Sequence, residues 1–337
     1  MANTVSRDLN FLDFAKIIAT FLVVIGHILR MYTGNGLFLP LEGNFYFSII
    51  CKYIYSFHMP LFFFISGGVF YIVKHKKNRY KSMLGFISNK TKRLLVPYIF
   101  ISVLLLIVMW HIGEIQIPIF SYYIHNYVYA YGCRHLWFLI ALFTISLYFN
   151  FLDSYIFSNS LCFLVVFILG FLIADYTTYI FQIASILKFS IYYYFGYLIM
   201  KNFKKIQLLF SIKNSICLFL FTLCLFLFYI KIEGVILKKL IELILGLSGT
   251  IMVIGIALYI EKKNKDSKGY LQQVNSYMYS IYLFHPLIIY LLFYYCRNTY
   301  INSYLMIICG FLISIFFSIL LTKLVRALGL RAFLGEK

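Results

Sequence analysis

The chain has 337 residues, of which 63% are hydrophobic and only 12% are charged. Soluble domains carry about 25% charged residues, so most of this chain cannot face water. The formal net charge of +19 could suit a nucleic-acid-binding protein, but the basic residues stand in short clusters between long apolar runs. That distribution is typical of the loops of a membrane protein and not of a groove for nucleic acid. The composition therefore predicts an all-α integral membrane protein.

Apolar runs recur along the whole chain, and a membrane-spanning helix needs about 20 such residues. We expect helices near residues 11–29, 54–73, 94–111, 136–152, 159–175, 186–200, 214–231, 240–260, 277–296 and 303–323. The sixth is short, and the eighth is interrupted by Glu242 and two glycines. The first carries Asp13, Lys16 and His27 and lacks a small-residue cleavage site, which favours a retained helix over a signal peptide. These runs predict a single transmembrane domain, 1–337, of about ten helices.

The positions of Lys and Arg predict the orientation of this bundle. Of the 30 basic residues, 21 lie in the N-terminal segment, the C-terminal tail and three loops, at about 74–93, 201–213 and 262–268. Cytoplasmic loops of membrane proteins carry an excess of Lys and Arg. We therefore expect both termini to be cytoplasmic, which requires an even number of spans.

The seven cysteines show no C-x-x-C pair, and most fall inside apolar runs. Small buried thiols are the simplest interpretation of that pattern, with no disulfide and no metal site expected.

Ionisable residues in the first helix form a polar stripe. At about 100° per residue, Lys16 and His27 return to within ~20° of each other, and Asp13 lies within ~60° of Lys16. Thr20 lies between them on the same face. Two simpler interpretations stay open, namely an ion pair of Asp13 with a snorkelling Lys16 and an interhelical hydrogen bond of His27. Charged groups inside a membrane are nevertheless functional candidates by default.

The two ends of the stripe suit different chemical tasks. A rise of 1.5 Å per residue separates Lys16 from His27 by ~16 Å, so the two side chains cannot touch. Histidine moves protons near neutral pH, which suits a base that activates a hydroxyl group. Lys16 or the basic loop offers positive charge for an oxyanion or for phosphates. The run Ser66-Gly67-Gly68 in the second helix favours close helix packing over catalysis.

Several short motifs occur in a fixed order along the chain. They are Asp13-x-x-Lys16, Val24-Ile25-Gly26-His27, Phe57-His58-Met59-Pro60-Leu61-Phe62-Phe63-Phe64-Ile65-Ser66-Gly67, Lys92-Arg93-Leu94-Leu95-Val96-Pro97-Tyr98, His135-Leu136-Trp137-Phe138-Leu139 and Ser280-Ile281-Tyr282-Leu283-Phe284-His285-Pro286. Together they resemble the membrane acyltransferase-3 family, and more closely its branch described as fucose 4-O-acetylase-like.

The resemblance implies a ten-helix domain in the bacterial cytoplasmic membrane that moves an acyl group, commonly acetyl from acetyl-CoA, to a sugar hydroxyl. Surface polysaccharides and lipid-linked precursors are the usual acceptors in that family. His27 matches the family's catalytic histidine, and we expect Asp13 to act with it. The expected substrate-binding residues are Lys16, His58, Ser66, Arg93, Trp137 and His285. Many relatives have Arg in place of Lys16, and lysine lacks the bidentate fork of arginine.

Two other functions stay open at the level of the sequence. A glycan exporter could use the polar stripe as a conduction path without any acyl transfer. A glycan-responsive sensor is a third hypothesis, but no cytoplasmic signalling domain is visible to support it. The basic loop 74–93 does not decide among them, because membrane orientation alone demands basic residues there.

Overall fold

The computed structural model describes residues 2–34, 43–79, 82–115, 119–207, 210–264, 268–299 and 301–336, and within these ranges it contains helices and no strand. The α-helices are α1 (Ala2–Arg30), α2 (Phe45–Tyr71), α3 (Met83–Lys90), α4 (Val96–His111), α5 (Ile119–Tyr123), α6 (Trp137–Ser158), α7 (Ser160–Ile173), α8 (Ile183–Lys201), α9 (Phe203–Ile206), α10 (Ile212–Tyr229), α11 (Val235–Lys263), α12 (Lys268–Cys296) and α13 (Ser303–Ala327). Turns of π-helix occupy Ile72–Lys76, Thr91–Leu95 and Ile124–Val128. Turns of 3₁₀-helix occupy Arg134–Leu136, Ala174–Tyr176, Ile180–Gln182 and Arg331–Leu334.

The long helices confirm the prediction of an all-α integral membrane protein. Nine helical segments within the described ranges are long and apolar enough to cross a membrane, and a tenth, Ser160–Tyr176, is apolar but shorter. Eight of the ten expected runs fall within one of these segments, and the runs 159–175 and 214–231 extend past theirs by one and two residues. A lipid core offers no hydrogen bonds to the backbone, so helices are the natural solution for such runs.

Several helices begin earlier than their apolar runs. α2 starts at Phe45, where the side chain of Asn44 accepts hydrogen bonds from the backbone nitrogens of Tyr46 and Phe47. The third span starts at Met83, where the Ser82 hydroxyl accepts from a backbone nitrogen in the same way. Such caps satisfy the free amides of a first helical turn, and they allow a helix to begin in polar sequence.

The cysteines correct one expectation. All seven are free thiols, but only Cys51 and Cys133 are buried. Cys162, Cys217 and Cys224 are exposed on α7 and α10. An apolar run can face lipid as well as the interior of the bundle, and run composition does not separate the two.

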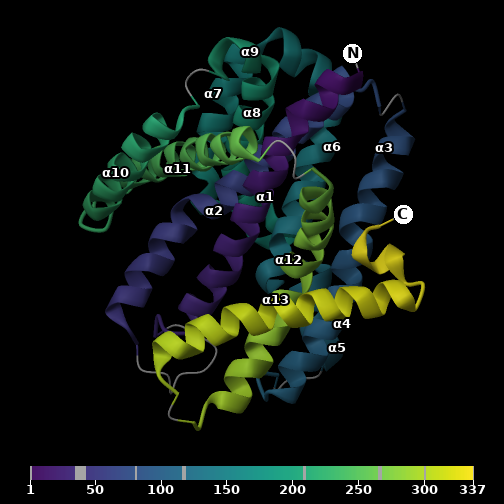
Figure 1. Cartoon of the computed structure of the whole chain (residues 1–337), viewed down its shortest axis with the longest axis vertical. Coiled ribbons are helices and arrows are strands. Elements are labelled where there is room, and N and C mark those ends of the chain that lie inside the picture. Colours follow the sequence, from purple (N-terminus) through teal and green to yellow (C-terminus); the bar gives the residue numbers. More distant parts are fainter. Residues whose placement is uncertain are drawn as a thin grey trace.

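Helix α1 occupies the middle of the bundle, and α13 lies across one face of it (Figure 1). Helix α1 packs against α2, α11, α12 and α13. Between Asn10 and Leu29 no residue of α1 is exposed, so the polar stripe of Asp13, Lys16, Thr20 and His27 is enclosed by protein. This position makes the polar stripe of α1 the natural place for a functional site.

The contact between α2 and α8 depends on glycine in both helices. A Cβ atom on Gly67 would overlap the main-chain carbonyl of Tyr193. In the same way, a Cβ atom on Gly196 would overlap the main-chain carbonyl of Phe64. Small residues permit this close backbone approach, which membrane helices use for association. The packing role expected for the Ser66-Gly67-Gly68 run is therefore confirmed at Gly67.

Replacing Gly67 with alanine should destabilise the protein by about 1–3 kcal/mol, because overpacking forces the two backbones apart. The measurement is the thermal unfolding of the purified protein in detergent. Gly269→Ala is the matched control, since no heavy atom lies within 4 Å of its added Cβ. That helical control should leave stability unchanged or slightly higher. An unfolding temperature of Gly67→Ala equal to that of the wild type would contradict this account of the α2–α8 contact.

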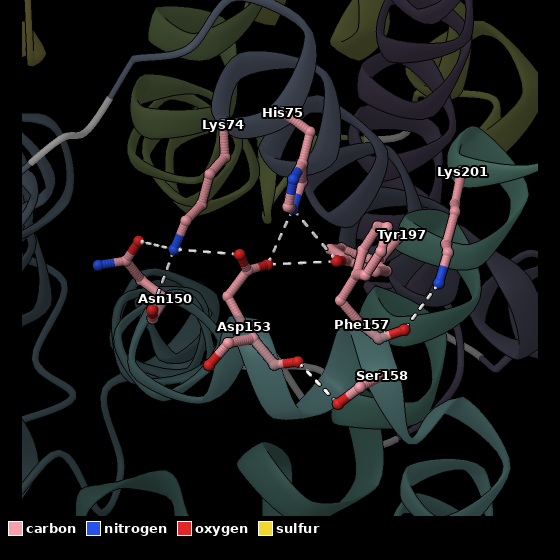
Figure 2. Close-up of polar contacts among 9 residues, drawn as sticks. Lys74, His75, Asn150, Asp153, Phe157, Ser158, Tyr197 and Lys201 are labelled. Atoms are coloured by element: carbon pink, nitrogen blue, oxygen red, sulfur yellow. Dashed lines mark hydrogen bonds and ion pairs between the residues drawn. The ribbon is translucent and has the colours of Figure 1, made fainter.

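A polar network joins the π-helical turn that follows α2 to α6 and α8 (Figure 2). The carboxylate of Asp153 lies 3.4 Å from Nζ of Lys74 and 3.0 Å from Nε2 of His75. It also accepts a hydrogen bond from the hydroxyl of Tyr197 at 3.2 Å. Nζ of Lys74 donates in addition to the side chain of Asn150 at 2.7 Å. The network lies at the membrane side that the basic loops predict to be cytoplasmic, and it ties three spans together there.

Candidate active site

Four histidines from four different spans converge beside α1. The ring centroid of His27 lies 4.9 Å from that of His285 and 6.4 Å from that of His135. The ring centroids of His135 and His285 are 5.9 Å apart. His58 joins the group through Tyr55, whose ring lies 4.6 Å from His58 and 6.2 Å from His27. Residues that are more than 200 positions apart in sequence therefore build one cluster, defined here as the histidine cluster: His27, His58, His135 and His285.

The hydrogen bonds of three of these rings fix which nitrogen carries the proton. In His27, His58 and His285, Nδ1 lies 2.9, 3.0 and 2.9 Å from the carbonyl oxygen of the residue four positions earlier. A carbonyl can only accept, so Nδ1 is the donor in each bond. A neutral imidazole has one N–H, which leaves the lone pair on Nε2. His27 thus has its basic nitrogen on the side of the ring that points away from its own backbone.

A cavity of about 490 Å³ adjoins the cluster and is lined by His27, His58 and His135. Its other walls include Arg30 at the end of α1 and Trp137 at the start of α6. It therefore lies in the half of the bundle where α1 ends and α6 begins. If the N-terminus is cytoplasmic, this is the outer half of the membrane.

A second cavity, of about 390 Å³, shares part of this wall. Four residues line both cavities: Arg134, Trp137, Lys188 and Phe189. The rings of Trp137 and Phe189 lie 5.0 Å apart, and Phe189 stacks on Phe63 at 4.8 Å. The second cavity adds further polar side chains, those of Asp175 and Gln182. The arrangement offers apolar ring faces beside hydrogen-bonding groups, which is the usual make-up of a small-molecule site.

The other end of the polar stripe has different partners. Oδ1 of Asp13 accepts a hydrogen bond from Nδ2 of Asn275 on α12 at 2.7 Å. Lys16 is close enough to Asp13 and Arg93 to interact electrostatically with both. The backbone carbonyl of Arg93 accepts from the Tyr279 hydroxyl at 2.8 Å, which fixes the position of the third span against α12. Cationic groups therefore gather around the N-terminal part of α1.

Asp13 is not a partner of His27. Fourteen residues separate the two, or ~21 Å along the helix axis. The carbonyl of Val23 orients the imidazole instead. In the described structure no ion pair within 4 Å joins Asp13 to Lys16, and Asn275 donates to one oxygen of the Asp13 carboxylate. The structure thus divides the predicted site residues between two ends of one helix.

Comparison with known proteins decides the family. A family model described as an acyltransferase domain matches residues 9–323. The chain belongs to this acyltransferase family. Two curated relatives match a shorter stretch, and both are nodulation protein NolL. The protein from Mesorhizobium japonicum is 40% identical over 99 residues, which is 29% of this chain and 24% of the relative. The protein from Sinorhizobium fredii is 37% identical over 95 residues, which is 28% of this chain and 23% of the relative. No solved structure gives a significant match.

The remaining predicted residues of this acyltransferase-family chain fall at different distances from the histidine cluster. His58 and Trp137 line the cavity, and His285 is fully buried behind His27. Arg93 lies with Lys16 at the other end of the stripe. Ser66 lies two helical turns beyond His58 on α2 and lines neither cavity.

Sequence reasoning missed several residues of this family member's cavity. Arg30 follows the first apolar run directly, and Arg134 and His135 precede the fourth. Lys188 and Glu242 stand inside apolar runs, and their side chains pair at 2.5 Å across α8 and α11. The signal that could have found the last two is the one applied to α1, an ionisable residue within a membrane span.

Proposed function

We propose that the protein is a membrane O-acyltransferase of the bacterial cytoplasmic membrane. It transfers acetyl from cytoplasmic acetyl-CoA to a hydroxyl of a cell-surface or lipid-linked glycan. Residues 1–337 form its single transmembrane domain. The observation that carries the proposal is the position of His27, whose Nδ1 is held by a backbone carbonyl while the ring lines a polar cavity inside a membrane span.

His27 acts as the general base in this proposal. The acceptor hydroxyl enters the cavity and donates its hydrogen bond to Nε2, the nitrogen that carries the lone pair. As the hydroxyl oxygen attacks the thioester carbonyl carbon, its proton moves to Nε2. The tetrahedral intermediate then collapses, the thiolate of coenzyme A leaves, and the proton held by the imidazole neutralises that thiolate. The products are an acetyl ester and free coenzyme A.

The donor is held at the other end of α1. Coenzyme A carries several phosphates, and Lys16, Arg93 and the basic loop 74–93 offer cations on the predicted cytoplasmic side. Lys16 lies ~16 Å from His27 along the helix. The long pantetheine arm of the donor therefore has to extend along α1, so that the thioester reaches the histidine cluster from the cytoplasm.

The acceptor approaches from the opposite side. A pyranose ring presents an apolar C–H face and a rim of hydroxyl groups. Trp137 and Phe189 offer apolar rings, and Ser56 and Tyr55 offer hydroxyl groups in the same cavity. Asp175 and Gln182 extend the polar wall into the second cavity. This combination favours a sugar over a purely apolar acceptor.

Membrane vesicles of opposite orientation test the proposal directly. Labelled acetyl-CoA does not cross a bilayer, so inverted vesicles that contain the protein should consume it and label a glycan or glycolipid. Right-side-out vesicles should not, and vesicles without the protein give the background. Equal consumption in both orientations would contradict a cytoplasmic donor site. No consumption in either, together with glycan movement across the membrane, would support an exporter instead.

A further inference from the structure

Two arginines face the cavities without a carboxylate partner. Arg30 and Arg134 both line the cavity beside His27, and Arg134 lines the second cavity as well. Within the described part of the chain neither forms an ion pair, and Nε of Arg134 is buried without a hydrogen-bond partner. The guanidinium carbon of Arg134 lies 5.9 Å from the ring centroid of Tyr290. An unpaired buried donor costs free energy, which a bound anion would offset.

The acidic residues of the two cavities are already neutralised by lysines. Glu242 pairs with Lys188 at 2.5 Å and with Lys239 at 3.6 Å. Lys239 also pairs with Asp175. No other carboxylate among the described residues lines either cavity. Two lysines thus balance the two carboxylates, and the arginines supply an excess of positive charge.

A strained backbone frame holds Arg134 in place. Its φ angle is +50°, and Ala130 has a φ of +52° in the same segment. The facing segment has the same feature at Phe181 (+50°) and Gln182 (+61°). Two hydrogen bonds join the segments. Nε2 of Gln182 donates to the carbonyl of Ala130 at 2.6 Å. The backbone nitrogen of Phe181 donates to the carbonyl of Tyr129 at 2.8 Å. Left-handed conformations are unfavourable for residues other than glycine and persist where the surrounding structure fixes them. The guanidinium is therefore presented from a rigid support.

We propose that Arg134, together with Arg30, binds an anionic group of the acceptor, a carboxylate or a phosphate, next to the hydroxyl that is acylated. The planar guanidinium fork suits either oxyanion, because both accept two parallel hydrogen bonds. The proposal rests on the proposed function and adds its substrate class, an acidic rather than a neutral acceptor. The anion has two sources, an acidic sugar of the glycan or the phosphate of a lipid carrier.

Matched acceptors test this site in the purified protein. One probe is a disaccharide that contains glucuronic acid, and its control is the disaccharide with glucose in that place. A prenyl-diphosphate-linked form of the neutral disaccharide is the third probe. We expect kcat/KM to favour one of the two anionic probes over the neutral control by about tenfold or more, since a charged hydrogen bond contributes about 1.5–3 kcal/mol. Preference for the uronate places the anion on the glycan, and preference for the diphosphate places it on the carrier.

Substitution of the arginine should remove that preference. Arg134→Gln should bring the ratio of anionic to neutral kcat/KM close to one, and Arg134→Lys should restore part of it. Arg297→Gln is the matched control, because Arg297 is an exposed arginine that lines neither cavity. Its ratio should equal that of the wild type. A rise in KM for acetyl-CoA in Arg134→Gln, with an unchanged acceptor ratio, would assign the arginine to the donor and overturn the proposal.

A binding readout separates this inference from the proposed function. Thermal stabilisation of the protein by each probe requires no turnover. Stabilisation by an anionic probe that Arg134→Gln abolishes supports the anion site, even in a protein that transfers no acetyl group. Acetyl transfer without any preference for an anionic probe, in either readout, refutes the anion site and leaves the acyltransferase intact.

Discussion

Replacing His27 with glutamine is expected to lower the rate of acetyl transfer by about 10²–10⁴-fold, the contribution of a positioned general base. Glutamine keeps a polar side chain that can donate to the Val23 carbonyl, so the packing of α1 is largely preserved. Its amide nitrogen has no lone pair to accept the hydroxyl proton at neutral pH. The loss should therefore appear in kcat, with the unfolding temperature in detergent close to that of the wild type.

The control is another histidine of the same chain. His111 is exposed at the end of α4 and lines neither cavity. Its Nε2 forms a hydrogen bond of 2.8 Å with the hydroxyl of Tyr295. His111→Gln should transfer acetyl at the normal rate. Wild-type turnover by His27→Gln would end the assignment of His27 as base. His135 would then be the next residue to replace, because neither of its ring nitrogens has a hydrogen-bond partner in the described structure.

The helices could be predicted from the sequence because lipid imposes a simple rule. A backbone in hydrocarbon must satisfy its own hydrogen bonds, so every long apolar run becomes a helix. The helix starts could not be read in the same way. α12 begins at Lys268 and runs through Gln272, Gln273 and Asn275 before it becomes apolar. Hydropathy does not register such polar turns, although Asn275 is the residue that binds Asp13.

Residue pattern alone predicts the site only along α1, whereas His58, Trp137 and His285 enter through the family resemblance. Helical periodicity places Asp13, Lys16 and His27 on one face, and the structure finds polar partners at both ends of that face. The partners themselves depend on how distant spans pack. Nothing in the local sequence brings His135 and His285 to within 6.4 and 4.9 Å of His27. The expectation that Asp13 acts with His27 meets the same limit, because a shared helix face does not bring together two side chains that lie ~21 Å apart along the axis.

The packing of α1 is also consistent with separate sites for the two substrates of the proposed reaction. Lys16 and Arg93 lie on the N-terminal side of the helix, whereas the two cavities lie at its C-terminal end. In the proposed function, a polyanionic donor and a glycan acceptor would therefore enter from opposite ends of α1. That proposal requires only the reactive thioester to reach the histidine cluster along α1, whose residues from Asn10 to Leu29 are not exposed.

Lys16 allows a test of the donor end of this arrangement. Lys16→Met removes the charge but roughly keeps the length of the side chain. If Lys16 binds a donor phosphate, KM for acetyl-CoA should rise by about tenfold or more, because a charged hydrogen bond is lost. Lys16→Arg should keep most of the activity, since arginine retains the charge and binds phosphate well.

A purely structural role for Lys16 predicts a different pattern, and a double substitution separates the two. If the lysine only offsets the charge of Asp13, Lys16→Met leaves a carboxylate inside the bundle without its counter-charge, and the protein loses stability. Asp13→Asn removes that charge while still offering Asn275 an oxygen to bond. The double variant should then recover the unfolding temperature in detergent. We expect it to be stable but to keep the raised KM for acetyl-CoA. A double variant with normal stability and a normal KM would show that Lys16 has no part in donor binding.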